Sequence, residues 1–136
     1  MLWFDHQFSE VELYFEHQAL FSEMLQKYSR VEGNVIVTAL RGVDKIHPGN
    51  RFILYSLFPE QNISVWAVDD KTKENCIFAV GHSVFNRTSK TDVGLLMQNY
   101  GGGGHQMVGI CQVPNKDAER VLDSLVEAVR EDDKAV

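Results

Sequence analysis

The chain has 136 residues, near the commonest size of a single domain, and its 44% hydrophobic and 24% charged residues are typical of a globular protein rather than a disordered one. Its net charge of -6 argues against a non-specific nucleic-acid binder, because affinity for phosphate backbones comes from clustered Lys and Arg. No apolar stretch is long enough to span a membrane, and no signal peptide follows Met1, so we expect a cytoplasmic protein.

The first predicted element is an amphipathic helix. Ser9 and Glu12 have the spacing of a capping box, and apolar residues then recur at three- and four-residue steps as far as Tyr28. We expect this helix to end near Gly33. The β-branched run Asn34–Leu40 that follows predicts a strand.

The central part of the chain predicts a short helix and a hairpin. The uniformly apolar run Phe52–Phe58 is interpreted as a short buried helix that Pro59 ends. Ile63–Val68 and Cys76–His82 have the composition of strands, and the polar segment between them favours an antiparallel pair.

The last third predicts two helices around one strand. Thr91 and Asp92 precede a helix that runs to the glycines, and Met107–Val113 is expected to be a strand. Asp117 opens a final helix, which we expect to fray over the charged residues 131–134. The whole chain therefore predicts an α/β (or α+β) fold, with a mixed β-sheet of about five strands covered by helices.

The two cysteines lack the close spacing of a metal-binding pair. Cys76 and Cys111 both lie in apolar surroundings. We interpret them as buried free thiols, with a disulfide between neighbouring strands as the less favoured alternative.

Four consecutive glycines are the most informative local feature. Each glycine costs conformational entropy when it is ordered, so a run of them needs a reason. One reason is a concave nest of backbone N–H groups that binds an anion, to which His105 adds a hydrogen bond or a charge. The alternative is a flexible turn with a packed or capping histidine. The candidate residues are Gly101, Gly102, Gly103, Gly104 and His105.

A second polar cluster lies between a predicted strand and a predicted helix. Arg87 offers a bidentate fork for phosphate, while Ser83, Asn86 and Thr88 offer neutral donors near a helix start. Such residues are often only helix caps. The cluster gains functional weight if it lies beside the glycine run.

These motifs together resemble those of a known family. The segments that carry the resemblance are Gly81–Ser83, Asn86–Ser89, Asp92–Gly94 and Gly101–His105. They are similar to the C-terminal DHH-associated domain of DHH phosphoesterases over about Val11–Val129. The segments Val31–Thr38, Gly49–Phe52 and Phe58–Ser64 resemble the exopolyphosphatase-related branch. One departure is Gln106–Val108, where the family has small residues before Gly109.

The resemblance implies two lobes in an intact protein. An N-terminal lobe holds two manganese or magnesium ions, and the C-terminal domain binds substrate phosphates through the glycine loop and His105, with Ser83, Asn86 and Arg87 beside it. The implied ligands are a phosphorylated small molecule, polyphosphate, or a nucleotide or oligonucleotide. We expect no cofactor bound by this chain alone.

The metal-binding lobe has no counterpart here except for one short segment. Residues 1–10, with Asp5, His6 and Gln7, resemble the surroundings of the Asp-His-His signature, either as a remnant of that lobe or by chance, and residues 11–136 would form the DHH-associated domain. Two-metal catalysis needs several ligands around both ions, which Asp5 and His6 cannot supply alone. We therefore expect a phosphate-binding domain without independent activity.

Two other functions stay open. One is a free-standing regulatory module that binds a nucleotide or a protein. The other is a minimal enzyme that uses His105 and a loosely held metal, which the unsuitable spacing of the remaining Asp and His residues disfavours. A homodimer is an alternative way to cover the apolar surface that a complete relative turns to its second lobe.

Overall fold

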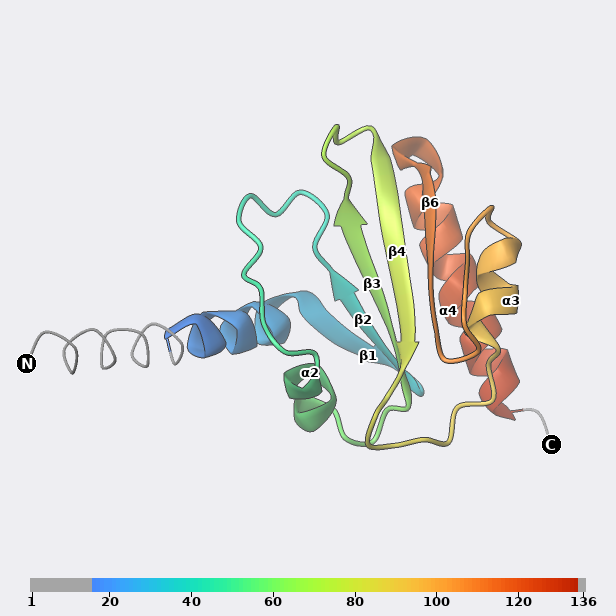
Figure 1. Cartoon of the computed structure of the whole chain (residues 1–136), viewed down its shortest axis with the longest axis horizontal. Helices are drawn as coiled ribbons and strands as arrows, with labels where there is room; N and C mark the ends of the chain where they lie inside the picture. Colours follow the sequence, from blue (N-terminus) through green and yellow to red (C-terminus); the bar gives the residue numbers. More distant parts are fainter. Residues whose placement is uncertain (1–15, 135–136) are drawn as a thin grey trace, which may run out of the picture.

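The computed structural model describes residues 16–134, so the predicted capping box at Ser9 and the segment 1–10 lie outside the described residues. A six-stranded mixed sheet forms the centre of the domain (Figure 1). Its strands are β1 (Ser29–Glu32), β2 (Val35–Ala39), β3 (Ile63–Asp69), β4 (Asn75–His82), β5 (Gly103–Gly104) and β6 (Val108–Pro114). They lie in the order β1-β2-β3-β4-β6-β5, and only β2 and β3 are parallel. The predicted α/β fold with a mixed sheet is confirmed.

Helices cover the sheet from both sides. They are the first helix (residues 16–28), α2 (Phe52–Leu57), α3 (Val93–Gln98) and α4 (Ala118–Lys134), with the 3-10 turn η1 (Asn115–Asp117) before α4. The first helix and α2 pack on one face, around Leu25, Leu54 and Trp66. The opposite face packs against α3 and α4 around Phe78, Met97 and Leu125. No helix within residues 16–134 is long and apolar enough to cross a membrane.

The burial of each strand follows its position in the sheet. β2 and β3 are covered on both faces, and their residues are buried almost without interruption. β6 instead alternates strictly, with Gly109, Cys111 and Val113 buried while Val108 and Ile110 are exposed. One face of β6 therefore has no cover from other parts of the described chain.

The first helix ends earlier than the sequence predicts. Residues 29–32 form β1, which pairs antiparallel with β2 through a tight turn at Gly33, whose φ is +63°. The pairing is reinforced by a hydrogen bond of 2.8 Å between the hydroxyls of Ser29 and Thr38. The expectation that the helix ends near Gly33 is wrong, because antiparallel pairing with the next strand outweighs the local helical pattern.

The C-terminal tail is also more ordered than expected. Residues 131–134 belong to α4, and the carboxylates of Asp132 and Asp133 accept hydrogen bonds from Thr91 and Asn62. The expected fraying over these residues is therefore wrong. Asp132 and Asp133 thus contact polar loops, while Glu131 and Lys134 form an exposed ion pair within α4.

Both cysteines are free and buried, as predicted. Cys76 lies on β4 and Cys111 on the neighbouring β6, in the core beneath α3 and α4. Burial raises the pKa of each thiol from 9.0 to about 11. Neither side chain is suited to act as a thiolate nucleophile near neutral pH.

Candidate functional site

The two motifs singled out from the sequence meet at one end of the sheet. The backbone N–H of His82, at the end of β4, donates to the C=O of Met107 at 2.9 Å. The N–H groups of Val93 and Gly94, at the start of α3, donate to the C=O groups of Gln106 and His105 at 2.9 and 2.8 Å. The turn between β5 and β6 thus lies beside the C-terminal end of β4 (Figure 1). The loop of residues 83–92 begins from the same end.

Three of the four consecutive glycines are required by the architecture itself. Gly101 has φ +78° and ends α3. A Cβ on Gly102 would lie 2.1 Å from the Ile110 oxygen, and one on Gly104 would lie 2.3 Å from the Val108 oxygen. Close backbone approach therefore explains Gly102 and Gly104 without any ligand.

The backbone donors of the run are partly used inside the domain. Gly101 N–H donates to the Gln98 oxygen at 3.2 Å, and Gly102 N–H donates to the Met97 oxygen at 2.9 Å, which is the pattern of a Schellman cap. These two N–H groups are not available to an anion. The nest expected over the whole run therefore does not include Gly101 and Gly102.

Gly103 differs from the other nine glycines of the chain. It has no positive φ, and a Cβ added to it would meet nothing within 4 Å. The fold itself gives no reason for glycine at this position. Gly103 borders an open hollow of about 340 Å³, whose lining also includes Ile77, Ile110 and Gln112.

His105 lies exposed in the turn between β5 and β6. Its backbone N–H donates to the Val108 oxygen at 2.7 Å, which closes the turn and fixes the residue at the tip. Within the part of the chain that the structure describes, no hydrogen bond engages its imidazole ring. The ring is therefore free to contact a ligand from solvent.

The polar residues Ser83 and Asn86 have partners within the domain. The buried Ser83 hydroxyl accepts the N–H groups of Phe85 and Asn86 at 3.1 and 3.0 Å. The Asn86 side chain donates to the Glu60 oxygen at 3.2 Å and accepts from Thr88 at 2.6 Å. Both residues shape the loop, but neither is a helix cap, because the next helix begins only at Val93 with Asp92 as its N-cap.

Arg87 is the exposed cation of the same loop. Its Nε donates to the Val84 oxygen at 3.2 Å, and it forms no ion pair with any carboxylate among residues 16–134. The terminal guanidinium nitrogens are thus left for a partner outside the chain. Among residues 16–134, no hydrogen bond joins the side chains of Arg87 and His105.

The start of α3 is not an anion site. The Asp92 side chain accepts the Leu95 N–H at 3.2 Å, and Val93 and Gly94 donate to the β5–β6 turn. The suggestion that this helix start attracts phosphate is therefore wrong, because its first N–H groups already have partners. An acidic cap would also repel an anion there.

Asn62 organises this end of the domain, and no sequence pattern indicated it. Its amide donates to Thr88 at 3.1 Å and to Asp133 at 3.0 Å, and its side-chain oxygen accepts from Asn34 at 3.0 Å. Its backbone oxygen also accepts the Ser83 N–H at 2.8 Å. This nearly buried residue links the 83–92 loop to the turn between β1 and β2 and to α4.

The manganese or magnesium ions implied by the resemblance find no fitting donor set here. Among residues 16–134, no three His, Cys, Asp or Glu side chains lie together as they would around a metal ion. Asp5 and His6 lie outside the described residues. The residues that are described therefore do not support a two-metal centre.

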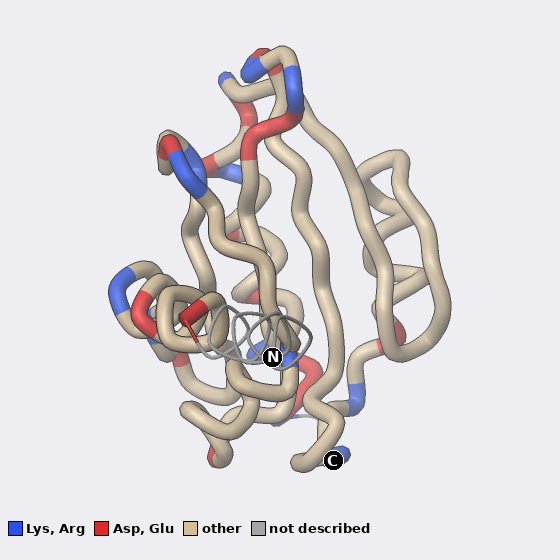
Figure 2. The backbone as a smooth tube through the Cα atoms, turned by 60° about the vertical axis from the view of Figure 1, so that its left-hand side comes forward, with Lys and Arg blue, Asp and Glu red and all other residues tan. Residues whose placement is uncertain are grey.

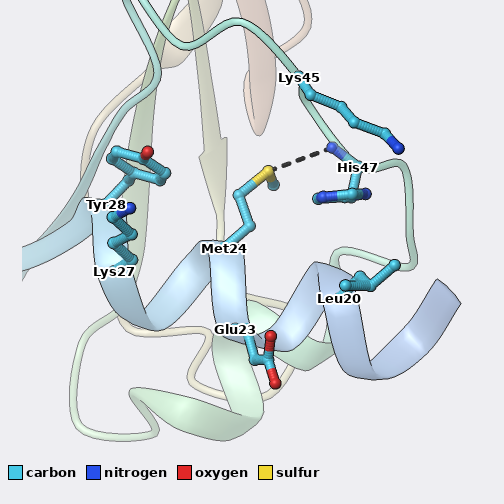
Figure 3. A pocket seen from close by; sticks show the side chains of 7 residues that line it. All are labelled: Leu20, Glu23, Met24, Lys27, Tyr28, Lys45 and His47. Atoms are coloured by element: carbon cyan, nitrogen blue, oxygen red, sulfur yellow. Dashed lines mark hydrogen bonds between the residues drawn. The ribbon is translucent and has the colours of Figure 1, made fainter. Parts of the chain in front are cut away.

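A separate hollow of about 200 Å³ lies between the first helix and the loop before α2 (Figure 3). Lys27 and Lys45 line it from opposite sides, while Met24 lies between them and accepts the His47 N–H at 3.4 Å. The two ammonium groups do not converge on one point. This hollow is a weaker candidate for anion binding than the loop of Arg87.

Comparison with known proteins relates the fold to phosphoesterases. PggH from Vibrio cholerae, a pGpG-specific phosphodiesterase, aligns with 91% of this chain at a TM-score of 0.88 and 42% sequence identity. An exopolyphosphatase-related protein from Bacteroides fragilis aligns with 88% of the chain at a TM-score of 0.65 and 13% identity, which shows a shared fold. The chain spans only 42% and 37% of these two proteins. No family model and no curated protein sequence matches it.

Proposed function

This chain is a DHH-associated domain of the DHH phosphoesterase family, related to exopolyphosphatase-related proteins, and from that premise we propose that it binds phosphate groups of a nucleotide through Arg87 and His105. The observation that carries the proposal is that backbone hydrogen bonds join both ends of the segment 82–94 to the turn between β5 and β6. Both residues are exposed, and neither side chain forms an ion pair within residues 16–134. They are thus available to a ligand that reaches this end of the sheet.

The chemistry of the two side chains suits a phosphate group. A guanidinium supplies a permanent charge and paired N–H donors, and an exposed imidazole supplies a directional donor. Ser83, Asn86 and the glycines act by shaping the two loops, since most of their polar groups have internal partners. Because the pGpG-specific relative is 42% identical to this chain over the aligned residues, we propose a guanine nucleotide as the ligand rather than inorganic polyphosphate.

We further propose that the domain does not hydrolyse its ligand alone. Phosphoester hydrolysis in a two-metal site requires several carboxylate and imidazole ligands around both ions. The described residues offer no such group, and more than half of PggH has no counterpart in this chain. These observations fit a protein in which this domain binds the ligand and a separate lobe hydrolyses it.

The test is a titration followed by NMR, with pGpG and with pyrophosphate. Signals of His105, Arg87 and the 83–92 loop should shift, and Arg87→Ala should weaken binding by about 1.5–3 kcal/mol, the usual contribution of a hydrogen bond to a charged group. Arg120→Ala, an exposed arginine on α4 that pairs with Asp117, is the matched control and should bind normally. If Arg87→Ala bound the ligand with unchanged affinity, Arg87 would not be part of the binding site.

The inactivity is tested with the same protein in manganese. We expect no release of product from pGpG, polyphosphate or bis-p-nitrophenyl phosphate. Turnover that survives repurification and disappears in Asp5→Asn or His6→Ala variants would contradict the proposed division of labour.

A further inference from the structure

An apolar surface extends over one face of β4 and β6. Ala79 pairs with Ile110 and Gly81 pairs with Val108 across the two strands, so their side chains share one face of the sheet. Val108 and Ile110 are 47% and 54% exposed, although both are large and apolar. The opposite face of the same strands is buried under α3 and α4.

An aromatic pair stands at one end of this surface. Gly81 has no side chain, and a Cβ there would lie 3.2 Å from Val108 and 3.5 Å from the hydroxyl of Tyr55, so the tip of Tyr55, from α2, reaches the β4 end of this surface. Phe52 of α2 contacts Phe85, with ring centroids 5.8 Å apart. These rings are 50% and 59% exposed, which makes them a protruding apolar knob.

The hollow beside Gly103 lies at the other end. It is lined by Ile77, Gly101–Gly103, Ile110, Cys111 and Gln112, and it measures about 340 Å³. The hollow stays open because Gly103 has no side chain, although the fold has room for one. We call the knob, the strand residues Ala79, Val108 and Ile110, and this hollow the β4–β6 face.

The β4–β6 face is built from uncharged parts of the chain. No Asp, Glu, Lys or Arg occurs in residues 75–86 or 93–115, while the whole chain carries a net charge of -6. The segment with β4, α3, β5 and β6 is accordingly free of charged residues along nearly all its length (Figure 2). Two copies that meet through this face therefore bring no like charges of these segments together.

We propose that the β4–β6 face is an interface between two copies of this chain. A two-fold interface requires a surface that is complementary to itself, in which residue i of one copy contacts residue j of the other and the reverse. The knob and the hollow lie on either side of Val108 and Ile110. A two-fold axis near these residues places Phe85 of each copy in the hollow of its partner.

The arrangement also accounts for Gly103. A glycine in a strand destabilises the isolated domain by roughly 0.5–1 kcal/mol relative to alanine. Its advantage appears only when another molecule fills the space beside it. An aromatic side chain in an uncharged, apolar hollow is the usual anchor of a protein interface.

The test is the mass of the purified full chain in solution over a range of concentrations, by light scattering and sedimentation equilibrium. The wild type should form a concentration-dependent dimer. Ile110→Glu should weaken association at least about tenfold, because it places two like charges in an apolar interface. Val31→Glu is the matched control, since Val31 is 43% exposed on β1 at the opposite edge of the sheet, and it should dimerise as the wild type does.

The knob and hollow are tested by a double-mutant cycle. Phe85→Ala empties the hollow and Gly103→Leu fills it, so each should weaken the dimer about tenfold, while the double variant should be little weaker than either single one. Circular dichroism and NMR should show all variants folded. The proposal would be overturned if the wild type stayed monomeric at NMR concentrations or if Ile110→Glu left the dimer intact. Strictly additive effects of Phe85→Ala and Gly103→Leu would also overturn it.

Discussion

The hydroxyl of Thr91 donates a hydrogen bond of 2.8 Å to the carboxylate of Asp132, although 41 positions separate the two residues in the chain. Thr91 is buried, and its backbone oxygen accepts a second hydrogen bond, of 2.8 Å, from Nε2 of His82. The loop before α3 is therefore fixed to the end of β4 and to the last turn of α4. This connection positions the loop that carries Arg87.

Thr91→Val should destabilise the domain. The change keeps the size of the side chain but leaves the partly buried Asp132 carboxylate without its donor, so the free energy of unfolding should fall by about 1.5–3 kcal/mol. Urea unfolding followed by tryptophan fluorescence measures it. Asp123→Asn, at an exposed position of the same helix, should stay within about 0.5 kcal/mol of the wild type.

The glycine run should respond unequally to alanine. Gly103→Ala should stabilise the isolated domain by about 0.5–1 kcal/mol, because the new Cβ meets nothing and the unfolded chain loses freedom. Gly102→Ala should destabilise it by at least about 2 kcal/mol, because its Cβ would lie 2.1 Å from a backbone oxygen. Thermal unfolding at low protein concentration, where association is minimal, compares the two. Equal effects would contradict the distinction between these glycines.

Local patterns were sufficient to predict most of the sheet. β3, β4 and β6 begin and end within one residue of their predicted bounds, because apolar runs between turn signals are a local property. β1 and β5 could not be predicted in this way. Ser29 continues a helical pattern and becomes a strand only by pairing with Thr38, while Gly103 and Gly104 have no strand propensity and pair with β6 alone.

The candidate site was predictable as motifs but not as geometry. The sequence indicated both Arg87 and His105 because their residue types stand out among turn-forming neighbours. The local bonds of the Ser83 hydroxyl to Phe85 and Asn86 were among the alternatives that the sequence left open. The sequence could not show that the N–H groups at the α3 start already have partners, since these come from the separate β5–β6 turn. Asn62 escaped notice for the same reason: its partners come from three distant parts of the chain.

The buried thiols predict a loss of stability at alkaline pH. Burial raises the pKa of Cys76 and Cys111 from 9.0 to about 11, so the unfolded chain releases these protons first. Their contribution is fully present below pH 9 and is lost as the pH rises toward 11. The free energy of unfolding should fall over this range.

Variants that lack one thiol separate this effect from other titrations. Cys76→Ala and Cys111→Ala should each show a shallower decline between pH 9 and 11 than the wild type, whatever their stability at pH 7. Burial also raises the pKa of Tyr55, and its contribution should persist in both variants. A decline of unchanged slope would show that the thiols do not titrate as the structure indicates.

Asn62→Asp should be strongly destabilising at neutral pH and less so in acid. The side chains of Asn and Asp are nearly identical in shape, but a carboxylate cannot donate a hydrogen bond to Thr88. It would also lie next to the Asp133 carboxylate, which in the wild type accepts a hydrogen bond of 3.0 Å from the Asn62 amide. Replacing that bond by repulsion in a nearly buried position should cost at least about 2 kcal/mol at pH 7.

Protonation of either carboxyl removes the repulsion and restores one donor, so the difference from the wild type should shrink as the pH falls through the raised pKa of the coupled pair. Urea unfolding of both proteins at neutral and at mildly acidic pH measures this difference. Asn99→Asp, at an exposed position after α3, controls for the added charge and should show no comparable pH dependence. A pH-independent deficit in Asn62→Asp would mean that shape rather than charge holds the 83–92 loop against α4.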